Sequence, residues 1–211
     1  MLQFSNIRKY YGDFLAMDIP SLTIEEGVWW VQGENGSGKT TFLKMVAGLH
    51  PFTGTITLDG SFTLEKHRQH FLKRVNYAEA EPLYPSFLTA KDLVELYCET
   101  KGGDLLQAKD LLKQLHLFEA YKQALGTYSS GMIKKLSLVL AFIGRPKIIL
   151  LDEPLITIDT NAVTAICSII KSKYKTGISF IITSHQTIHE DQLDFTGLLV
   201  AKNKTINKAI E

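Results

Sequence analysis

The sequence predicts an α/β fold, and three features of the chain support this prediction. A short apolar strand at residues 28–31 runs into the glycine-rich stretch GENGSGKTT at residues 33–41, and a helical apolar pattern follows. Further along, largely apolar strands at residues 147–151 and 178–183 flank an amphipathic helix, which is typical of a buried parallel sheet. The start of the chain is rich in strands and its middle is helical. We therefore expect an α/β core with an antiparallel β subdomain and a helical insertion at about residues 80–143.

Strands are expected wherever a short apolar or alternating run lies between turn residues. Residues 18–20 and 25–27 are expected turns because they contain Pro20 and Gly27, and Asp59 with Gly60 closes a later strand. The expected strands are residues 2–10, 14–18, 22–25, 28–31, 55–58, 75–78, 147–151 and 178–183, with a terminal hairpin of residues 198–200 and 205–206.

Helices are expected where apolar residues recur with helical spacing. Thr89 is a good N-cap, because Asp92 stands three residues later in the position of a capping box. Gly102 and Gly103 separate two helices of the middle segment. The expected helices are residues 41–49, 89–100, 105–117, 130–142 and 162–174.

The glycine-rich stretch fits the phosphate-binding pattern G-x-x-x-x-G-K-[ST], the P-loop (Walker A motif). Its glycines let the backbone turn tightly and direct several N–H groups at one point, beside the positive end of the following helix. Lys39 supplies a cation for the β and γ phosphates, and the hydroxyl of Thr40 can ligate Mg²⁺. The motif residues expected at the nucleotide are Gly33, Asn35, Gly36, Ser37, Gly38, Lys39, Thr40 and Thr41.

Two further groups of polar residues follow buried strands. Asp152 and Glu153 come directly after the strand at residues 147–151, and His185 follows the strand at residues 178–183. The carboxyl ends of strands in an open α/β sheet meet at the edge where ligands bind, and the P-loop arrives at the same edge. We expect Asp152 to hold Mg²⁺, Glu153 to deprotonate an attacking water, and His185 to act beside the γ-phosphate.

Composition narrows the range of functions. The 211 residues are 45% hydrophobic with a formal net charge of +1, so one domain (residues 1–211) is expected and no nucleic-acid partner is. Cys98 and Cys167 lie far apart and suit reduced thiols in the cytosol, and we expect His67, His70 and His189 to be surface residues. We see no signal peptide and no membrane span, so any membrane role must come through a partner.

The order of these motifs resembles the ATP-binding subunit of ABC transporters over essentially the whole chain. The decisive addition is YSSGM at residues 128–132, a variant of the family's LSGGQ signature that stands shortly before Asp152. The resemblance implies that ATP and Mg²⁺ are bound in a head-to-tail dimer. In this dimer Ser129, Ser130 and Gly131 face the γ-phosphate that is held by the P-loop of the second subunit.

Other positions carry over from the resemblance one at a time. Tyr11 matches the aromatic residue that stacks on adenine, although a strand-packing role is the alternative. Asp159 matches a loop that crosses to the second subunit, and it could equally be the N-cap of the next helix. His185 matches the family's switch histidine.

The chain also departs from the family pattern. Ala80 stands where the family usually has Gln, so the usual link from the Mg²⁺ site to the transmembrane partner is in doubt, with Glu79 or Glu81 as substitutes by a register shift. Ser130 replaces Gly and Met132 replaces Gln in the signature, a variant familiar from bacterial exporter-type ATPases. The unusual bulky residues Trp29 and Trp30 are expected to pack in the sheet.

By resemblance, the chain is expected to be an ATPase that powers a separate transmembrane permease from the cytoplasmic face of the membrane, as a homo- or heterodimer. Residues 83–96 would dock on that permease. Two alternatives remain open from the sequence. One is a soluble ABC-type ATPase that works on DNA or ribosomes, and the other is a regulatory module that binds ATP without hydrolysing it.

Overall fold

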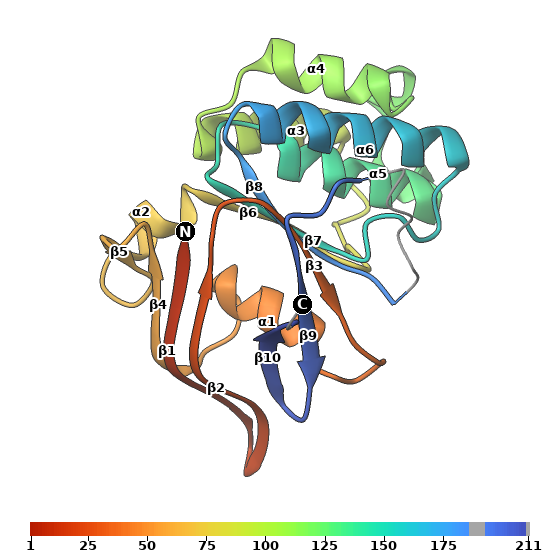
Figure 1. The fold of residues 1–211 in the computed structure, drawn as a ribbon. Coiled ribbons are helices and arrows are strands. Elements are labelled where there is room, and N and C mark those ends of the chain that lie inside the picture. The colour runs from red at the N-terminus through yellow and green to blue at the C-terminus, as the bar shows by residue number, and fades with distance from the viewer. Residues whose placement is uncertain (186–192, 210–211) are drawn as a thin grey trace.

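The computed structural model describes residues 1–185 and 193–209 and confirms the α/β prediction. An antiparallel sheet and a mostly parallel sheet enclose helix α1 (Lys39–Val46), and the larger helices cover the other face of the parallel sheet (Figure 1). The buried side chains form two clusters, one between the two sheets and one between the parallel sheet and these helices.

The antiparallel sheet has the strand order β2-β1-β4-β5. The predicted turn at residues 18–20 is wrong, because β2 runs through it without a break and Ile19 pairs with Ile7 of β1. β2 is an edge strand and Pro20 is exposed, so the missing N–H of Pro20 costs the sheet nothing. The strands are β1 (Leu2–Tyr11), β2 (Phe14–Ile24), β4 (Thr53–Leu58) and β5 (Phe62–Thr63).

The second sheet has the order β10-β9-β3-β8-β7-β6, and its neighbouring strands are parallel except for the terminal hairpin β9–β10. Ile148 and Leu150 of β7 join the cluster around α1, whereas Ile149 and Leu151 join the cluster under the helices. Both faces are covered, which explains the continuous apolar runs. The strands are β3 (Val28–Gln32), β6 (Val75–Ala78), β7 (Ile148–Asp152), β8 (Ser179–Thr183), β9 (Gly197–Lys202) and β10 (Thr205–Lys208).

The helices of the middle segment begin and end close to where they were expected. The capping box of α3 is formed, with the Thr89 hydroxyl accepting from the Asp92 amide at 3.2 Å and the Asp92 carboxylate accepting from the Thr89 amide at 2.8 Å. Gly102, at φ +63°, ends the same helix. The helices on this side are α3 (Ala90–Lys101), α4 (Leu105–Gln114), α5 (Ser130–Phe142) and α6 (Thr160–Lys175), with 3₁₀ turns η1 (Phe118–Ala120) and η2 (Leu125–Thr127).

Two differences from the expected elements have local causes. Helix α1 begins at Lys39 rather than at residue 41, because Gly38 in the left-handed region (φ +100°) already serves as its N-cap. The short helix α2 (Arg68–Leu72) was not expected, since it is only five residues long and buries one apolar side chain, Phe71. A five-residue helix carries too little periodicity to be seen in a sequence.

Strand register brings the functional segments to one edge of the parallel sheet. Asp152, the last residue of β7, pairs with Thr183, the last residue of β8, and Thr183 also pairs with Val31 of β3. The P-loop therefore leaves β3 at the same level as the acidic pair leaves β7. The loop that contains Ala80 leaves the adjacent strand β6 at this edge as well.

Candidate nucleotide site

The P-loop is shaped by glycines that no other residue could replace without strain. Gly36 has φ +79°, and a Cβ there would point into open space where a ligand could lie. A Cβ on Gly33 would lie 2.6 Å from the carbonyl oxygen of Ala201, so the backbone passes too close to β9 for a side chain. The loop therefore packs against the sheet on one side and leaves its inner side open.

Lys39 ties the two ends of the loop together. Its side chain is buried, and its ammonium group donates to the carbonyl oxygens of Gly33 at 2.7 Å and Glu34 at 3.1 Å. The Ser37 hydroxyl is buried in the same loop, with no hydrogen-bond partner among the residues that the structure describes. A cation and an unpaired hydroxyl inside a loop of backbone N–H groups suit a bound phosphate chain.

One cavity of about 750 Å³ brings most of the predicted site together. Its walls come from the P-loop, the loop after β6, the start of α5 and the segments that follow β7 and β8. The lining residues are Asn35, Gly36, Gly38, Lys39, Thr40, Thr41, Ala80, Glu81, Pro82, Leu83, Ser130, Lys134, Glu153, Ile156, Thr157 and His185.

Asp152 is 1% exposed, and both of its carboxylate oxygens are hydrogen-bonded. One oxygen accepts from the Thr183 hydroxyl at 2.6 Å, and the other accepts from the Tyr77 hydroxyl at 3.3 Å. Burial, together with the charge of Asp152, raises the pKa of the Tyr77 phenol well above its ordinary value, so Tyr77 remains a donor. These two bonds fix the orientation of the buried carboxylate.

Glu153 and His185 form a direct pair on the wall of the cavity. The His185 Nδ1 lies 3.2 Å from one Glu153 carboxylate oxygen, and the His185 backbone N–H donates to the other, also at 3.2 Å. Glu153 adopts φ +47°, and its own N–H donates to the Thr183 hydroxyl at 3.0 Å. The predicted base and the predicted switch histidine are thus adjacent in the folded chain.

Tyr11 lies beside the P-loop with its ring about half exposed. Its hydroxyl is 3.4 Å from the Thr41 hydroxyl, and the Lys9 ammonium lies 4.5 Å from its ring centroid. The ring also meets His50 edge-on. Because about half of the ring is exposed and this part does not pack in the strand, an aromatic base could stack on it.

The signature segment occupies the start of α5. The Ser129 hydroxyl caps the helix by accepting from the Met132 amide at 3.2 Å, while Ser130 lines the cavity. A Cβ on Gly131 would lie 3.2 Å from the carbonyl oxygen of Thr157, so the helix start packs closely on the loop after β7. Asp159, at the end of that loop, caps α6 through the Ala162 amide at 2.9 Å, which is the helix-cap role considered from the sequence.

Three residues of the site were not identified from the sequence, namely Tyr77, Thr183 and Lys134. Lys134 is a buried lysine on α5, and burial lowers the pKa of its ammonium to about 8, while the carboxylates of Asp152 and Glu153 act in the opposite direction. The sequence signal for Lys134 is weak, because it stands beside a second lysine, Lys135, just before the largely apolar run of residues 136–142. Tyr77 and Thr183 carried none, because aromatic and β-branched residues are ordinary in strands.

The oxygen groups present fit a magnesium ion better than a metal held by the protein alone. No group of three His, Cys, Asp or Glu side chains that could hold a metal occurs among residues 1–185 and 193–209. Thr40 and Asp152 offer hard oxygen donors next to a phosphate-binding loop. Mg²⁺ typically takes one or two protein ligands and completes its shell with water and substrate phosphates.

The remaining predictions concern residues outside the site. His67 and His70 are exposed as expected, and His189 lies outside the described residues. Trp29 is buried in the cluster around α1, and Trp30 stacks on Phe195, so both pack as expected.

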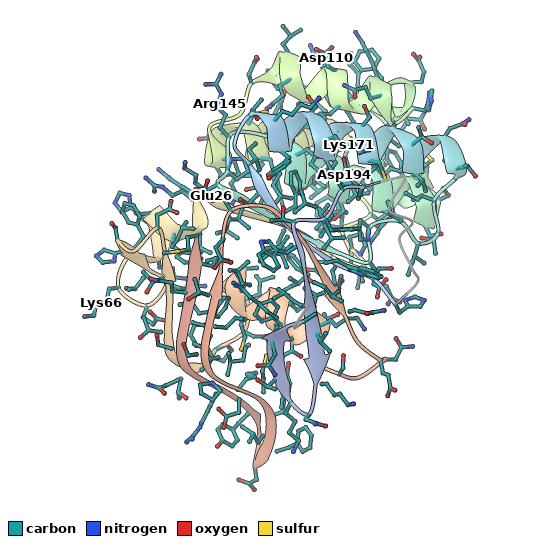
Figure 2. All side chains as sticks on the ribbon, viewed as in Figure 1. Glu26, Lys66, Asp110, Arg145, Lys171 and Asp194 are labelled. Atoms are coloured by element: carbon teal, nitrogen blue, oxygen red, sulfur yellow. The ribbon has the colours of Figure 1, made fainter. Side chains whose placement is uncertain are left out.

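The surface carries charges of both signs. Glu26, Lys66, Asp110 and Arg145 are exposed on separate parts of the molecule (Figure 2). Cys98 and Cys167 are buried free thiols. Of the helices that the structure describes, none has the length and apolar character needed to cross a bilayer.

The P-loop lies between the first strand of the parallel sheet and the helix that follows, and an acidic pair at the end of a second strand faces it. This arrangement defines a P-loop NTPase. Residues 17–156 match the family described as "ABC transporter". The chain belongs to this family as an ATP-binding subunit of the ATPase class, which confirms the predicted fold class and resemblance.

Two curated relatives and one solved structure agree with this assignment. The chain is 30% identical to the linearmycin resistance ATP-binding protein LnrL of Bacillus subtilis, over 88% of this chain and 61% of that protein. It is also 30% identical to the lantibiotic transport ATP-binding protein SrtF of Streptococcus pyogenes, over 94% of this chain and 86% of that protein. A structure titled "Structure of ATP binding subunit of ABC transporter" shares the fold, with a TM-score of 0.89 and 19% identity over 99% of this chain and 89% of that chain.

Proposed function

We propose that this chain hydrolyses ATP to drive a separate membrane permease, as one half of a head-to-tail dimer that encloses two ATP molecules. The observation that carries the proposal is the pairing of Glu153 with His185 at 3.2 Å on the wall of the cavity that the P-loop also lines. A module that only binds ATP would need the loop but not this pair. The name of SrtF, a lantibiotic transport ATP-binding protein, supports a role in transport but not a particular cargo.

Binding of ATP would use groups that surround the cavity. The P-loop N–H groups and Lys39 would hold the phosphates, and the exposed ring of Tyr11 would stack on adenine. Thr40 and Asp152 would hold Mg²⁺. When bound, this ion neutralises part of the negative charge of the phosphates.

Hydrolysis would proceed by attack of water on the γ-phosphorus, with cleavage of its bond to the bridging β–γ oxygen and release of ADP and phosphate. Glu153 would accept the proton of that water, and His185 would hold the Glu153 carboxylate and face the γ-phosphate. Lys39 would stabilise the charge that develops on the phosphate oxygens. A positioned base contributes about 10²–10⁴-fold to the rate.

The dimer would complete the site through the start of α5. Ser129, Ser130 and Gly131 would face the γ-phosphate of the second subunit, where the N-terminus of a helix suits an anion. The permease would dock on residues 83–96, which carry the exposed apolar side chains of Leu83, Phe87 and Leu96. This docking would place the subunit at the cytoplasmic face of the membrane.

A non-hydrolysing regulatory module is the second candidate, because Ala80 cannot ligate a metal or donate a hydrogen bond through its side chain. Lys39, Asp152, Glu153 and His185 argue against it, since each is present and placed around one edge of the sheet. The third candidate, a soluble ATPase that works on DNA or ribosomes, has support only from motif analogy.

Sedimentation of Glu153→Gln with and without Mg-ATP tests the proposal. This substitution removes the base and should lower turnover by about 10²-fold or more while ATP still binds. The ATP-bound dimer should therefore accumulate, and the protein should shift from monomer to dimer only when Mg-ATP is present.

The matched control is Ser130→Arg in the same background, which should abolish the dimer and keep ATP bound at the P-loop. A protein that binds ATP and stays monomeric would contradict homodimer closure, and a different ATPase chain or a permease would then have to complete the site. Turnover that survives Glu153→Gln would remove Glu153 from its assigned role.

A further inference from the structure

Lys134 makes a set of contacts that joins three parts of the nucleotide site. Its side chain projects from α5 and is 2% exposed. The ammonium group donates to the carbonyl oxygens of Glu79 at 2.8 Å, Ala80 at 2.9 Å and Asp152 at 2.9 Å. An ammonium group has three N–H donors, and here all three are used on backbone carbonyls.

The contact with Asp152 fixes the peptide group that leads into Glu153. Lys134 binds the C=O of this peptide, and the Thr183 hydroxyl accepts its N–H at 3.0 Å. Both polar ends of one peptide are therefore held, from α5 on one side and from β8 on the other. Glu153 follows at φ +47°, a conformation that an L-residue keeps only when its surroundings impose it.

The other two contacts fix the loop after β6. Glu79 and Ala80 stand at the exit of β6, and Ala80 lines the cavity together with Glu81. The methyl group of Ala80 cannot form a hydrogen bond with another part of the site. Lys134 instead links this loop to the end of β7, because its ammonium group binds backbone carbonyls of both. A shift of the loop would move the ammonium group and, through it, the peptide before Glu153.

We propose that Lys134 is a positioning residue of the ATP site, which holds the Glu153 peptide, the Ala80 loop and the start of α5 in one arrangement. This inference rests on the proposed hydrolytic function. It assigns no proton transfer to Lys134 and no contact with ATP. The role is to keep the base at the distance and angle that attack on the γ-phosphate requires, since misplacement of about 1 Å can cost about 10²-fold in rate.

The chain offers a matched control in Lys101. Its ammonium group also donates to backbone carbonyls, those of Leu72 at 2.6 Å and Val75 at 3.0 Å, and burial lowers the pKa of this lysine as well. Its contacts reach α2 and the start of β6, and neither of them involves Asp152 or Ala80. A general structural effect of losing a lysine that binds backbone carbonyls should therefore appear in Lys101→Met as well as in Lys134→Met.

The experiment measures kcat, the KM for ATP and the midpoint of thermal unfolding for the wild type, Lys134→Met, Lys134→Arg and Lys101→Met. We expect kcat of Lys134→Met to fall by about tenfold or more with a KM within about threefold of wild type, because the P-loop cradle is untouched. Lys134→Arg should recover much of kcat, since a guanidinium group can also donate to several carbonyls. Lys101→Met should lose stability and keep kcat.

Two results would overturn the inference. One is a Lys134→Met protein with wild-type kcat, whether or not its KM rises, and the other is a loss of activity in Lys134→Met and Lys101→Met that tracks their loss of stability. A wild type that binds ATP without turnover would instead contradict the proposed hydrolysis. Hydrogen exchange of the Glu153 amide then decides, because faster exchange in Lys134→Met than in Lys101→Met supports the positioning role and equal exchange excludes it.

Discussion

At the scale of single residues, the site depends on side chains that bind other protein groups rather than the nucleotide. The hydroxyl of Thr183 is the clearest case, because it donates to the Asp152 carboxylate at 2.6 Å and accepts the Glu153 N–H at 3.0 Å. One buried oxygen thereby orients both acidic residues. Their two proposed roles, metal ligand and base, are coupled through it.

We predict that Thr183→Val lowers kcat by about 10–100-fold, as is typical when a residue that orients a metal ligand is lost. Valine has the same shape, so the core should keep its packing while the carboxylate and the amide lose their shared partner. Steady-state ATP hydrolysis checks this. Thr183→Ser, which keeps the hydroxyl, is the control, and equal activity of the valine and serine variants would show that the hydroxyl does not orient the acids.

Tyr77 provides a second residue-scale test. Its hydroxyl donates to the other oxygen of Asp152 at 3.3 Å, and its raised pKa keeps the proton in place. We predict that Tyr77→Phe raises the Mg²⁺ concentration needed for half-maximal ATP hydrolysis, by about tenfold or less because the bond is long. Titration of activity with Mg²⁺ at saturating ATP measures this midpoint concentration. An unchanged midpoint would mean that the Thr183 hydroxyl alone is enough to orient the Asp152 carboxylate.

At the scale of elements, helix ends decide where the middle segment of the chain can pack. Helix α3 starts at a complete capping box and stops at Gly102, so its length is set by local chemistry. The hydrogen bonds from the side chain and amide of Thr89 lower the pKa of Asp92. A carboxyl whose pKa is depressed in the folded state stabilises the fold above its unfolded pKa, and this contribution is lost as the pH falls through the folded value.

We predict that Thr89→Ala lowers the free energy of unfolding by about 1 kcal/mol at neutral pH, because an N-cap is lost. The difference from wild type should shrink below about pH 4, where Asp92 is protonated in the unfolded chain. Urea unfolding at the two pH values measures both effects. Thr100→Ala, at an exposed threonine late in the same helix, is the control, and a loss equal to that of Thr89→Ala would argue against the cap.

How far the sequence predicts this structure depends on whether the signal is local. The P-loop, the capping box and the apolar runs of β7 and β8 carry their own patterns, so the α/β core and the edge that holds Lys39, Asp152 and Glu153 could be predicted. The three bonds of Lys134 join segments that are more than fifty residues apart and others eighteen apart, and no local pattern contains them. The turn predicted at residues 18–20 is wrong for the opposite reason. Pro20 is a local turn signal, but the pairing of β2 with β1 overrides it.

At the scale of the whole molecule, the segment between the end of β6 and the middle of α3 carries exposed apolar side chains, as the β1–β2 hairpin and the start of α4 also do. Three large apolar side chains that lie between the end of β6 and the middle of α3 are exposed, and Phe87 is 79% exposed. Exposed apolar residues that gather in one segment mark an interaction site more often than isolated ones do. In the proposed function this segment contacts the permease.

We predict that Phe87→Asp weakens the association of the chain with its permease and leaves the ATP hydrolysis of the isolated subunit unchanged. The aspartate would place a charge where an apolar surface should be buried, and truncation of such a contact typically costs about 1 kcal/mol or more when it lies at the centre of an interface. Co-purification of the subunit with the permease, from membranes of cells that produce both, measures the association. Leu106→Asp is the control, because Leu106 is 67% exposed at the start of α4, outside the segment proposed to dock. If both variants co-purify like the wild type, the permease binds elsewhere, and if both are lost, the effect is one of surface charge rather than of a docking site.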